Sequence, residues 1–209
     1  MEDILEIYKR PYDPEFPVIC MDEQPVQLVK EIRMPLPARP GDPRRYDQHY
    51  ERAGTANIFM FTEPLGQWRR ATVTARRTSI DWALQIRCLL EEDYPDAVKV
   101  LLVSDNLNTH KIASLYEAFP PALARSLVER LEIHYTPKHG SWLNVAECEL
   151  SAMTRQCLSR RIGVPEELQG EVEAWSLQRN TSQIGTDWRF TAEDARIKLK
   201  SLYPQVQLS

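Results

Sequence analysis

The sequence predicts an α/β protein whose mixed sheet combines an antiparallel hairpin with parallel strands and carries helices on both faces. Two β-rich runs, 56–64 and 67–75, are separated by a Pro-Leu-Gly turn, which is typical of a hairpin. Two further strands, 98–105 and 132–136, alternate with stretches of helical periodicity, and strands connected by helices are usually parallel. The length of 209 residues fits one domain.

The first part of the chain is expected to contain mainly strands and turns. VICMDE at 18–23 is a short apolar run that ends in two carboxylates, as a buried strand does. Four prolines and one glycine predict an extended loop over 34–47. After the hairpin, Thr78 or Ser79 is expected to cap a helix that ends before Pro95.

The remainder is expected to alternate strands with helices. The stretch 98–105 is almost wholly apolar, like a strand buried on both faces of a sheet. A helical stretch interrupted by a Pro-Pro pair leads to the strand at 132–136. Three helices are expected to follow, at 143–161, at 166–180 and within 187–203.

Composition excludes several classes of protein. No run approaches the roughly 18 consecutive apolar residues of a membrane span. The opening MEDILEIYKR is too acidic for a secretory or mitochondrial leader. The cysteines show neither CxxC spacing nor a histidine at zinc-finger distance. We therefore expect a cytoplasmic protein with no structural zinc and no membrane partner.

Charge is distributed unevenly along the chain. The formal net charge is −4, yet 33–77 contain nine arginines against four acidic residues, a local balance of +5. Arginine is the cation best suited to bidentate contacts with phosphate. We therefore expect a DNA-phosphate-contacting face, with a solvated strand face as the alternative. The arginines assigned to it are Arg44, Arg45, Arg69 and Arg70.

Acidic residues end two of the predicted strands. Asp22 closes the first strand and Asp105 closes the apolar strand that follows the hairpin. Sites in open α/β sheets lie beyond the carboxyl ends of strands, so these acids are candidates to share a hard cation. A turn or a helix cap is the alternative for each. On the long helix that follows residue 142, Glu147 and Glu149 flank the apolar stripe at about 80° on either side, and the helical wheel does not choose between them.

Four motifs taken together resemble a known family. They are MDEQP (21–25), VSDNLNTH (103–110), HYTPKHGSWLNVAE (134–147) and DWRFTAEDARIKLKSLYP (187–204). The combination is similar to the catalytic domain, a DDE superfamily endonuclease, of bacterial insertion-sequence transposases in the mariner-related group (insertion-sequence-630 type). The resemblance implies a ribonuclease-H-like fold in one domain, 1–209, with the helical segment 187–204 packed on it.

The resemblance also implies the composition of the active site. Asp22, Asp105 and Glu147 match the three acids of the family, so the resemblance favours Glu147 over Glu149. These three residues are the expected catalytic groups and the ligands of two Mg²⁺ ions, with Mn²⁺ as a substitute.

Other residues of the same motifs are expected close by. Residues expected to support the metal ligands are Asn106, His110 and Asn144. Lys138 and His139 are expected to contact the DNA backbone, and for Lys138 a solvated loop is the alternative.

The implied function is that of a transposase catalytic domain. Such a domain cleaves DNA strands with water at insertion-sequence ends and then joins the 3′-hydroxyl to target DNA, so transposon ends and target DNA are the expected partners. The resemblance also implies a homodimer and a place in the bacterial cytoplasm, on the nucleoid when DNA is bound. The helix-turn-helix region that usually precedes this domain in the family is expected to be absent.

Two alternative functions stay open at the level of the sequence. One is a catalytically silent DNA-binding or assembly remnant of a truncated transposase. The other is a nuclease of the same fold that acts on RNA–DNA hybrids.

Overall fold

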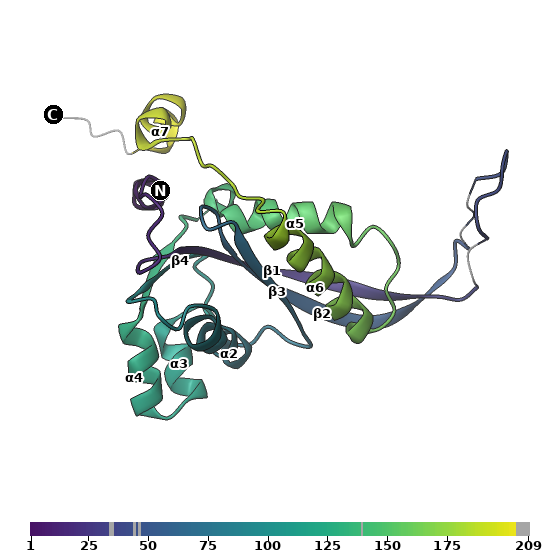
Figure 1. Cartoon of the computed structure of the whole chain (residues 1–209), viewed down its shortest axis with the longest axis horizontal. Helices are drawn as coiled ribbons and strands as arrows, with labels where there is room; N and C mark the ends of the chain where they lie inside the picture. The colour runs from purple at the N-terminus through teal and green to yellow at the C-terminus, as the bar shows by residue number, and fades with distance from the viewer. Residues whose placement is uncertain (34–35, 44, 46, 139, 204–209) are drawn as a thin grey trace.

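A computed structural model describes residues 1–33, 36–43, 45, 47–138 and 140–203. In these residues, one mixed sheet has the strand order β3-β2-β1-β4-β5 (Figure 1). Its strands are β1 (Val18–Glu31), β2 (Tyr50–Glu63), β3 (Trp68–Thr74), β4 (Val100–Ser104) and β5 (Leu131–Tyr135). The first three strands pair antiparallel, whereas β4 runs parallel to β1 and to β5. The mixed sheet predicted from the sequence is therefore confirmed.

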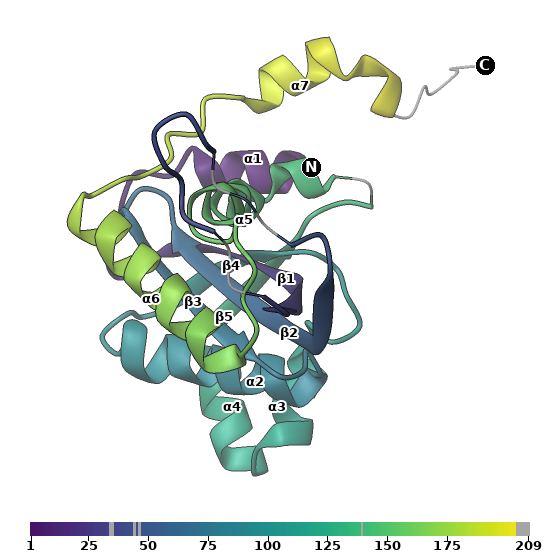
Figure 2. The same ribbon diagram turned by 90° about the vertical axis from the view of Figure 1, so that its right-hand side faces the viewer.

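Helices cover both faces of this sheet (Figure 2). On one side are α1 (Glu2–Tyr8), the 3₁₀ turn η2 (Ser141–Leu143), α5 (Val145–Gln156), α6 (Pro165–Thr181) and α7 (Ala192–Lys198). On the other side are α2 (Ser79–Cys88), the π-helical turn η1 (Leu89–Asp93), α3 (Ile112–Ala118) and α4 (Pro121–Glu129). A last 3₁₀ turn, η3 (Lys200–Leu202), follows α7.

The alternation of side chains along the strands divides the core into two layers. In β1, Cys20 packs with the α5–α6 layer, whereas Ile19 and Met21 pack with the α2–α4 layer. Successive strand residues point to opposite faces, so each face of the sheet carries its own apolar set. The same alternation decides on which face of the sheet each polar side chain of β1 lies.

β1 is longer than the sequence predicts. The sequence suggested a strand that ends at Asp22 and Glu23, but β1 continues to Glu31 because β2 pairs with it along this whole length. β4 pairs only with Val18–Cys20. β3 remains paired to β2 opposite the β1 residues up to Pro25, and from Val26 onward β1 and β2 continue as a two-stranded arm whose far end extends away from the helices (Figure 1). Asp22 therefore lies inside a strand, just past its junction with β4.

Two helices also differ from the sequence prediction. The sequence does not predict α1, and α5 ends at Gln156 rather than near 161. After α5 the chain turns back to β1, where the Val29 N–H donates a 2.8 Å hydrogen bond to the carbonyl of Ile162. This contact requires the helix to end early.

The C-terminal segment contacts α1 and η2. The Trp188 ring packs beside Tyr8 at 5.2 Å between centroids and stacks on Trp142 at 6.4 Å. Arg196 of α7 forms an ion pair with Glu2 of α1 at 2.6 Å. None of the helices in the described part of the chain is both long and apolar enough to cross a membrane.

Candidate active site

Asp22 and Asp105 lie at matching positions on neighbouring strands. The last paired residues of β1 and β4 are Cys20 and Val103, and each acid comes two residues farther along its strand direction. Adjacent strands are about 4.8 Å apart, so the two side chains start from neighbouring points of the backbone. The parallel pairing of β1 with β4 thus brings together two acids that are distant in sequence.

The Asp22 carboxyl is surrounded by like charge. Burial is the largest effect on its pKa, which is raised to about 6, and the carboxylates of Asp105, Glu147 and Glu23 act in the same direction. A 2.8 Å hydrogen bond from the Glu23 N–H to Asp22 Oδ1 partly opposes them. Mutual repulsion of this kind is relieved when a cation binds among the carboxylates.

Asn144 fixes the start of α5 against β1. Its Oδ1 caps the helix by accepting from the Ala146 N–H at 3.1 Å, and its Nδ2 donates to the Met21 carbonyl at 2.8 Å. Glu147 lies in the first turn of this helix, and Met21 directly precedes Asp22. The tie therefore holds the third acid of the predicted site close to the first.

The structure separates the two glutamates that the helical wheel left equivalent. Glu149 is 3% exposed and forms ion pairs with Arg69 at 3.1 Å and Arg179 at 2.9 Å. Glu147 is partly exposed and close enough to Asp22 to affect its pKa. Glu149 thus has a structural role between β3 and α6, whereas Glu147 belongs with Asp22 and Asp105, and these three residues are called the acidic cluster below.

His110 connects Asp105 to Glu23, a residue that the sequence did not indicate as part of the site. Its Nδ1 lies 2.6 Å from Asp105 Oδ1 and its Nε2 lies 2.9 Å from Glu23 Oε1. Burial alone lowers the pKa of His110, but the bonds to the two carboxylates outweigh it and raise the pKa to about 9. With both nitrogens protonated at neutral pH, the ring donates to both carboxylates.

Sequence reasoning missed Glu23 for a physical reason. The neighbouring acids of MDEQP are visible in the sequence, but strand alternation directs Glu23 to the face opposite Asp22. Its partner His110 is 87 residues away along the chain. The adjacent pair of acids inside an apolar strand is the one signal that could have drawn attention to it.

The prediction that Arg69 contacts DNA is wrong. Its side chain is 1% exposed and paired with Glu149, and it also donates to the backbone carbonyl of Ile184. The Asn180 amide bonds the Arg69 backbone on both sides, which fixes β3 to α6. A guanidinium held in this way cannot reach a phosphate.

Arg70 is not on a free surface either. It forms a 2.7 Å ion pair with Asp93 and a 2.6 Å hydrogen bond with Gln85, under the helical layer of α2 and η1. The assignment of Arg70 to a phosphate-contacting face is therefore also wrong. Alternation along β3 sends the two neighbouring arginines to opposite faces, and each meets an acid there.

The remaining predicted contact residues lie in exposed segments or outside the described residues. Arg45, Lys138 and Asn106 are exposed, and Arg45 forms a 2.8 Å ion pair with the partly exposed Asp42. Arg44 and His139 lie outside the described residues.

The chemical types of the described side chains fit a divalent cation. In the described ranges, no group of three or more His, Cys, Asp or Glu residues is close enough together to form a preformed metal site. The donors at Asp22, Asp105 and Glu147 are all carboxylate oxygens, which are the ligands that Mg²⁺ and Mn²⁺ accept. Mg²⁺ keeps several waters and commonly uses only one or two carboxylates together with substrate phosphates, so a complete protein cage is not required.

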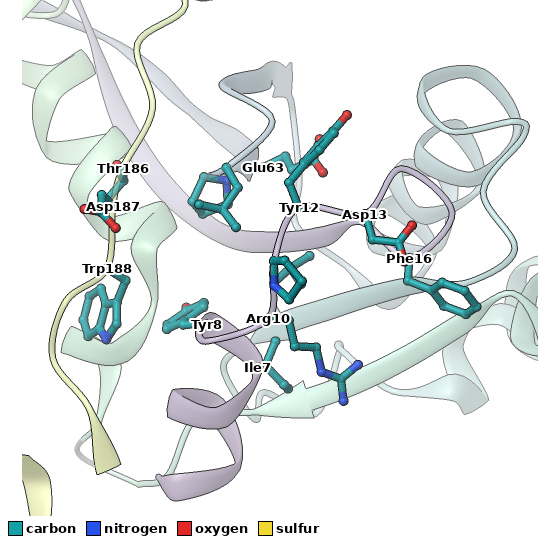
Figure 3. A pocket seen from close by; sticks show the side chains of 14 residues that line it. Ile7, Tyr8, Arg10, Tyr12, Asp13, Phe16, Glu63, Thr186, Asp187 and Trp188 are labelled. Atoms are coloured by element: carbon teal, nitrogen blue, oxygen red, sulfur yellow. The ribbon is translucent and has the colours of Figure 1, made fainter. Parts of the chain in front are cut away.

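A pocket of about 40 Å³ lies away from these acids, between the α1–β1 connection, the β2–β3 turn and the segment around Trp188 (Figure 3). Apolar side chains such as Ile7 and Phe16 line it together with the carboxyl groups of Asp13, Glu63 and Asp187. The guanidinium of Arg10 lines it as well, and none of the three predicted catalytic acids does.

Comparison with known proteins finds one family match over most of the chain. Residues 17–169 match the model of a family described as DDE superfamily endonuclease. No curated protein matches the chain. The matched range begins just before β1 and includes all three carboxylates.

Three solved structures of similar fold are complexes of Mos1 transposase. The Mos1 transposase paired-end complex with left transposon end matches over 88% of this chain, at 14% identity and a TM-score of 0.57. The Mos1 mariner paired end complex with Mn and the Mos1 strand transfer complex match equally far, at 15% and 16% identity with TM-scores of 0.56 and 0.55. The chain spans 55–56% of the length of these proteins. The likeness confirms the ribonuclease-H-like fold.

Proposed function

The chain belongs to the family of DDE superfamily endonucleases, and on this premise we propose that it is the catalytic domain of a transposase of the bacterial insertion-sequence type. The observation that best supports the proposal is that three carboxylates from separate elements lie close enough for the charges of two of them to act on the third. Asp22 comes from β1, Asp105 from the end of β4 and Glu147 from the first turn of α5. Burial is the main cause of the raised pKa of Asp22, and the carboxylates of Asp105 and Glu147 act in the same direction, which supports their proximity.

In this proposal Asp22, Asp105 and Glu147 are the catalytic residues and hold two Mg²⁺ ions, with Mn²⁺ as a substitute. When bound, the cations supply activation of a water molecule and neutralisation of charge on the leaving oxygen. The all-oxygen donor set and the repulsion around Asp22 support this assignment.

The chain itself supplies the positioning that phosphoryl transfer needs. Asp22 is held inside a paired strand, and the Asn144 tie to Met21 holds the helix that carries Glu147. Asp105 is held by His110. Groups fixed before the substrate arrives require little reorganisation during the reaction, which is the main source of catalysis in phosphoryl transfer.

Two successive steps use the same carboxylates. In the first, a water molecule loses a proton and its oxygen bonds to phosphorus, the bond from phosphorus to the 3′-oxygen breaks, and that oxygen takes up a proton. In the second, the 3′-hydroxyl loses its proton and its oxygen bonds to a phosphorus of target DNA, a target P–O bond breaks, and the released target oxygen takes up a proton. Transposon ends and target DNA are the proposed partners, and a homodimer in the bacterial cytoplasm is proposed from the resemblance of the motifs.

Nicking of supercoiled plasmid tests the proposal. We expect the purified chain to nick DNA with Mg²⁺ or Mn²⁺, and not with a chelator. Asp105→Asn and Glu147→Gln should remove nicking, and Glu129→Gln, which alters an exposed pair on α4, should not. Wild-type nicking by Asp105→Asn or Glu147→Gln would overturn the assignment.

The same assay separates the alternatives. Binding of DNA without nicking under any divalent cation would favour a catalytically silent remnant. Faster cleavage of RNA–DNA hybrids than of duplex DNA would favour a nuclease of the same fold.

A further inference from the structure

We propose that Glu23 is a positioning residue that acts through His110 to hold the Asp105 carboxylate in its cation-binding orientation. This inference rests on the proposed function in that it takes Asp105 as a metal ligand. It concerns a residue outside the three acids and on the opposite face of β1 from Asp22.

Asp105 needs support from outside its own backbone. It follows the last residue of β4, and 105–107 adopt no helix or strand. Its side chain is 34% exposed. A carboxylate on such a segment has rotational freedom that a cation site must remove, and partners behind the ligand commonly do this.

His110 provides a rigid support. The ring is completely buried and stacks on Trp82 with 5.9 Å between ring centroids. The Tyr135 hydroxyl donates to the His110 carbonyl at 2.7 Å, and Ser104 Oγ lies 3.1 Å from Nδ1. The backbone and the ring plane of His110 are therefore both fixed.

Glu23 fixes the one orientation of the His110 ring that these contacts leave open, namely the direction in which its two nitrogens point. Its side chain is 2% exposed, and Oε1 lies 2.9 Å from His110 Nε2. Held at Nε2, the ring points Nδ1 at Asp105 Oδ1. Among the described residues no hydrogen bond engages Asp105 Oδ2, which leaves this oxygen for a cation.

The second oxygen of Glu23 is buried as well. Oε2 has no hydrogen-bond partner in the described part of the chain, and the half-exposed guanidinium of Arg77 lies 3.9 Å away. Arg77 balances the buried carboxylate from the solvent side. Glu23 is thus held between a cation at the surface and the imidazole that contacts Asp105.

The chain offers a more exposed histidine bridge as a control. His134 also lies between two carboxylates, with Nδ1 2.9 Å from Asp3 and Nε2 3.0 Å from Glu132. None of these three residues contacts the acidic cluster. A substitution of His134 reports the general effect of breaking a histidine bridge.

Titration of the DNA-free protein with Mn²⁺ tests the proposal, with affinity measured by calorimetry or by the paramagnetic resonance of free Mn²⁺. Glu23→Leu removes the acceptor and should weaken Mn²⁺ binding by about 10–100-fold. Glu23→Gln keeps an acceptor oxygen and should stay within about threefold of wild type. His134→Asn should have no effect. Wild-type affinity in folded Glu23→Leu would overturn the proposal.

If Glu23→Leu fails to fold, a second pair of variants tests whether the contact of His110 with Asp105 supports Mn²⁺ binding. His110→Asn can place its amide N–H near the position of Nδ1, whereas His110→Gln places it near Nε2. We expect the Asn variant to bind Mn²⁺ about tenfold more tightly than the Gln variant, and equal affinities would overturn the proposal. If wild type and Asp105→Asn bind Mn²⁺ equally, the proposed function itself fails, whereas a loss confined to Asp105→Asn rejects only the positioning role.

Discussion

The side-chain amide of Asn144 donates a 2.8 Å hydrogen bond to the carbonyl of Met21, directly before Asp22 in β1. The same side chain caps α5, which carries Glu147. One buried residue therefore connects the strand of the first acid to the helix of the third.

We expect Asn144→Ala to lower the free energy of unfolding by about 2–4 kcal/mol, because it removes a helix cap and leaves the Met21 carbonyl without its partner. Urea denaturation measures this change. Thr78→Ala is the matched control, since Thr78 caps α2 in an exposed position and its loss costs about 1 kcal/mol. Equal losses in both variants would show that the tie to Met21 contributes nothing.

Substitution of Arg69 should affect stability rather than DNA binding. Arg69→Ala leaves the buried Glu149 with one cation fewer, and breaking a buried pair costs about 3–5 kcal/mol. Arg189→Ala, which breaks an exposed pair with Asp187, should cost less than about 1 kcal/mol. Urea denaturation of both variants checks this, and an Arg69→Ala protein as stable as Arg189→Ala would contradict the buried ion pair.

Exposed cations should account for the salt dependence of DNA binding. Arg45→Ala and Lys138→Ala should each reduce the slope of log affinity against log salt by about one unit, since each removes one phosphate contact. Fluorescence anisotropy over a salt series measures the slope. Arg125→Ala on α4 is the control and should leave it unchanged. An unchanged slope in Arg45→Ala or Lys138→Ala would show that this residue lies in a solvated loop.

Asp22 should make the metal-free protein less stable as pH rises from about 4 to 6. Its pKa in the fold is about 6, raised by burial and by the neighbouring carboxylates, against an ordinary value of 3.8 for an aspartate. Between these values the folded state binds more protons than the unfolded state, so the free energy of unfolding falls with increasing pH.

Asp22→Asn should therefore stabilise the metal-free protein at pH 7 by on the order of 2 kcal/mol. The difference from wild type should shrink toward zero as pH falls to about 4, where Asp22 is protonated. Urea denaturation of both proteins across this range, in the presence of a chelator, measures it. A difference that does not change with pH would contradict the buried, crowded carboxyl.

Much of the fold could be predicted because its signals are local. The apolar residues of β4 indicate a buried strand, and the helical spacing of Leu143, Ala146, Leu150 and Met153 matches the buried face of α5 and η2. β1 was predicted too short because its outer half is a two-stranded arm with exposed polar residues. Such a segment lacks the apolar run that marks a buried strand.

The contacts that the sequence could not show are all long-range. Arg69 sits among polar and small residues of β3, so its burial becomes visible only when Asn180 of α6 packs on that strand. The link between Glu23 and His110 likewise depends on how the loop after β4 folds back under β1. The position of Asp105, in contrast, follows from the end of β4, which its apolar run indicates, and the parallel pairing of β1 with β4 places Asp22, inside β1, beside it.

The central claim is that Asp22, Asp105 and Glu147 form one cation-dependent cleavage site. Its most direct test measures single-turnover DNA cleavage in Mn²⁺ by Asp22→Asn, by Glu147→Gln and by the double variant. Residues that act as a unit are not additive, so each single variant should fall to the rate seen with a chelator and the double variant should fall no further. Cleavage at the wild-type rate by either single variant would contradict the account.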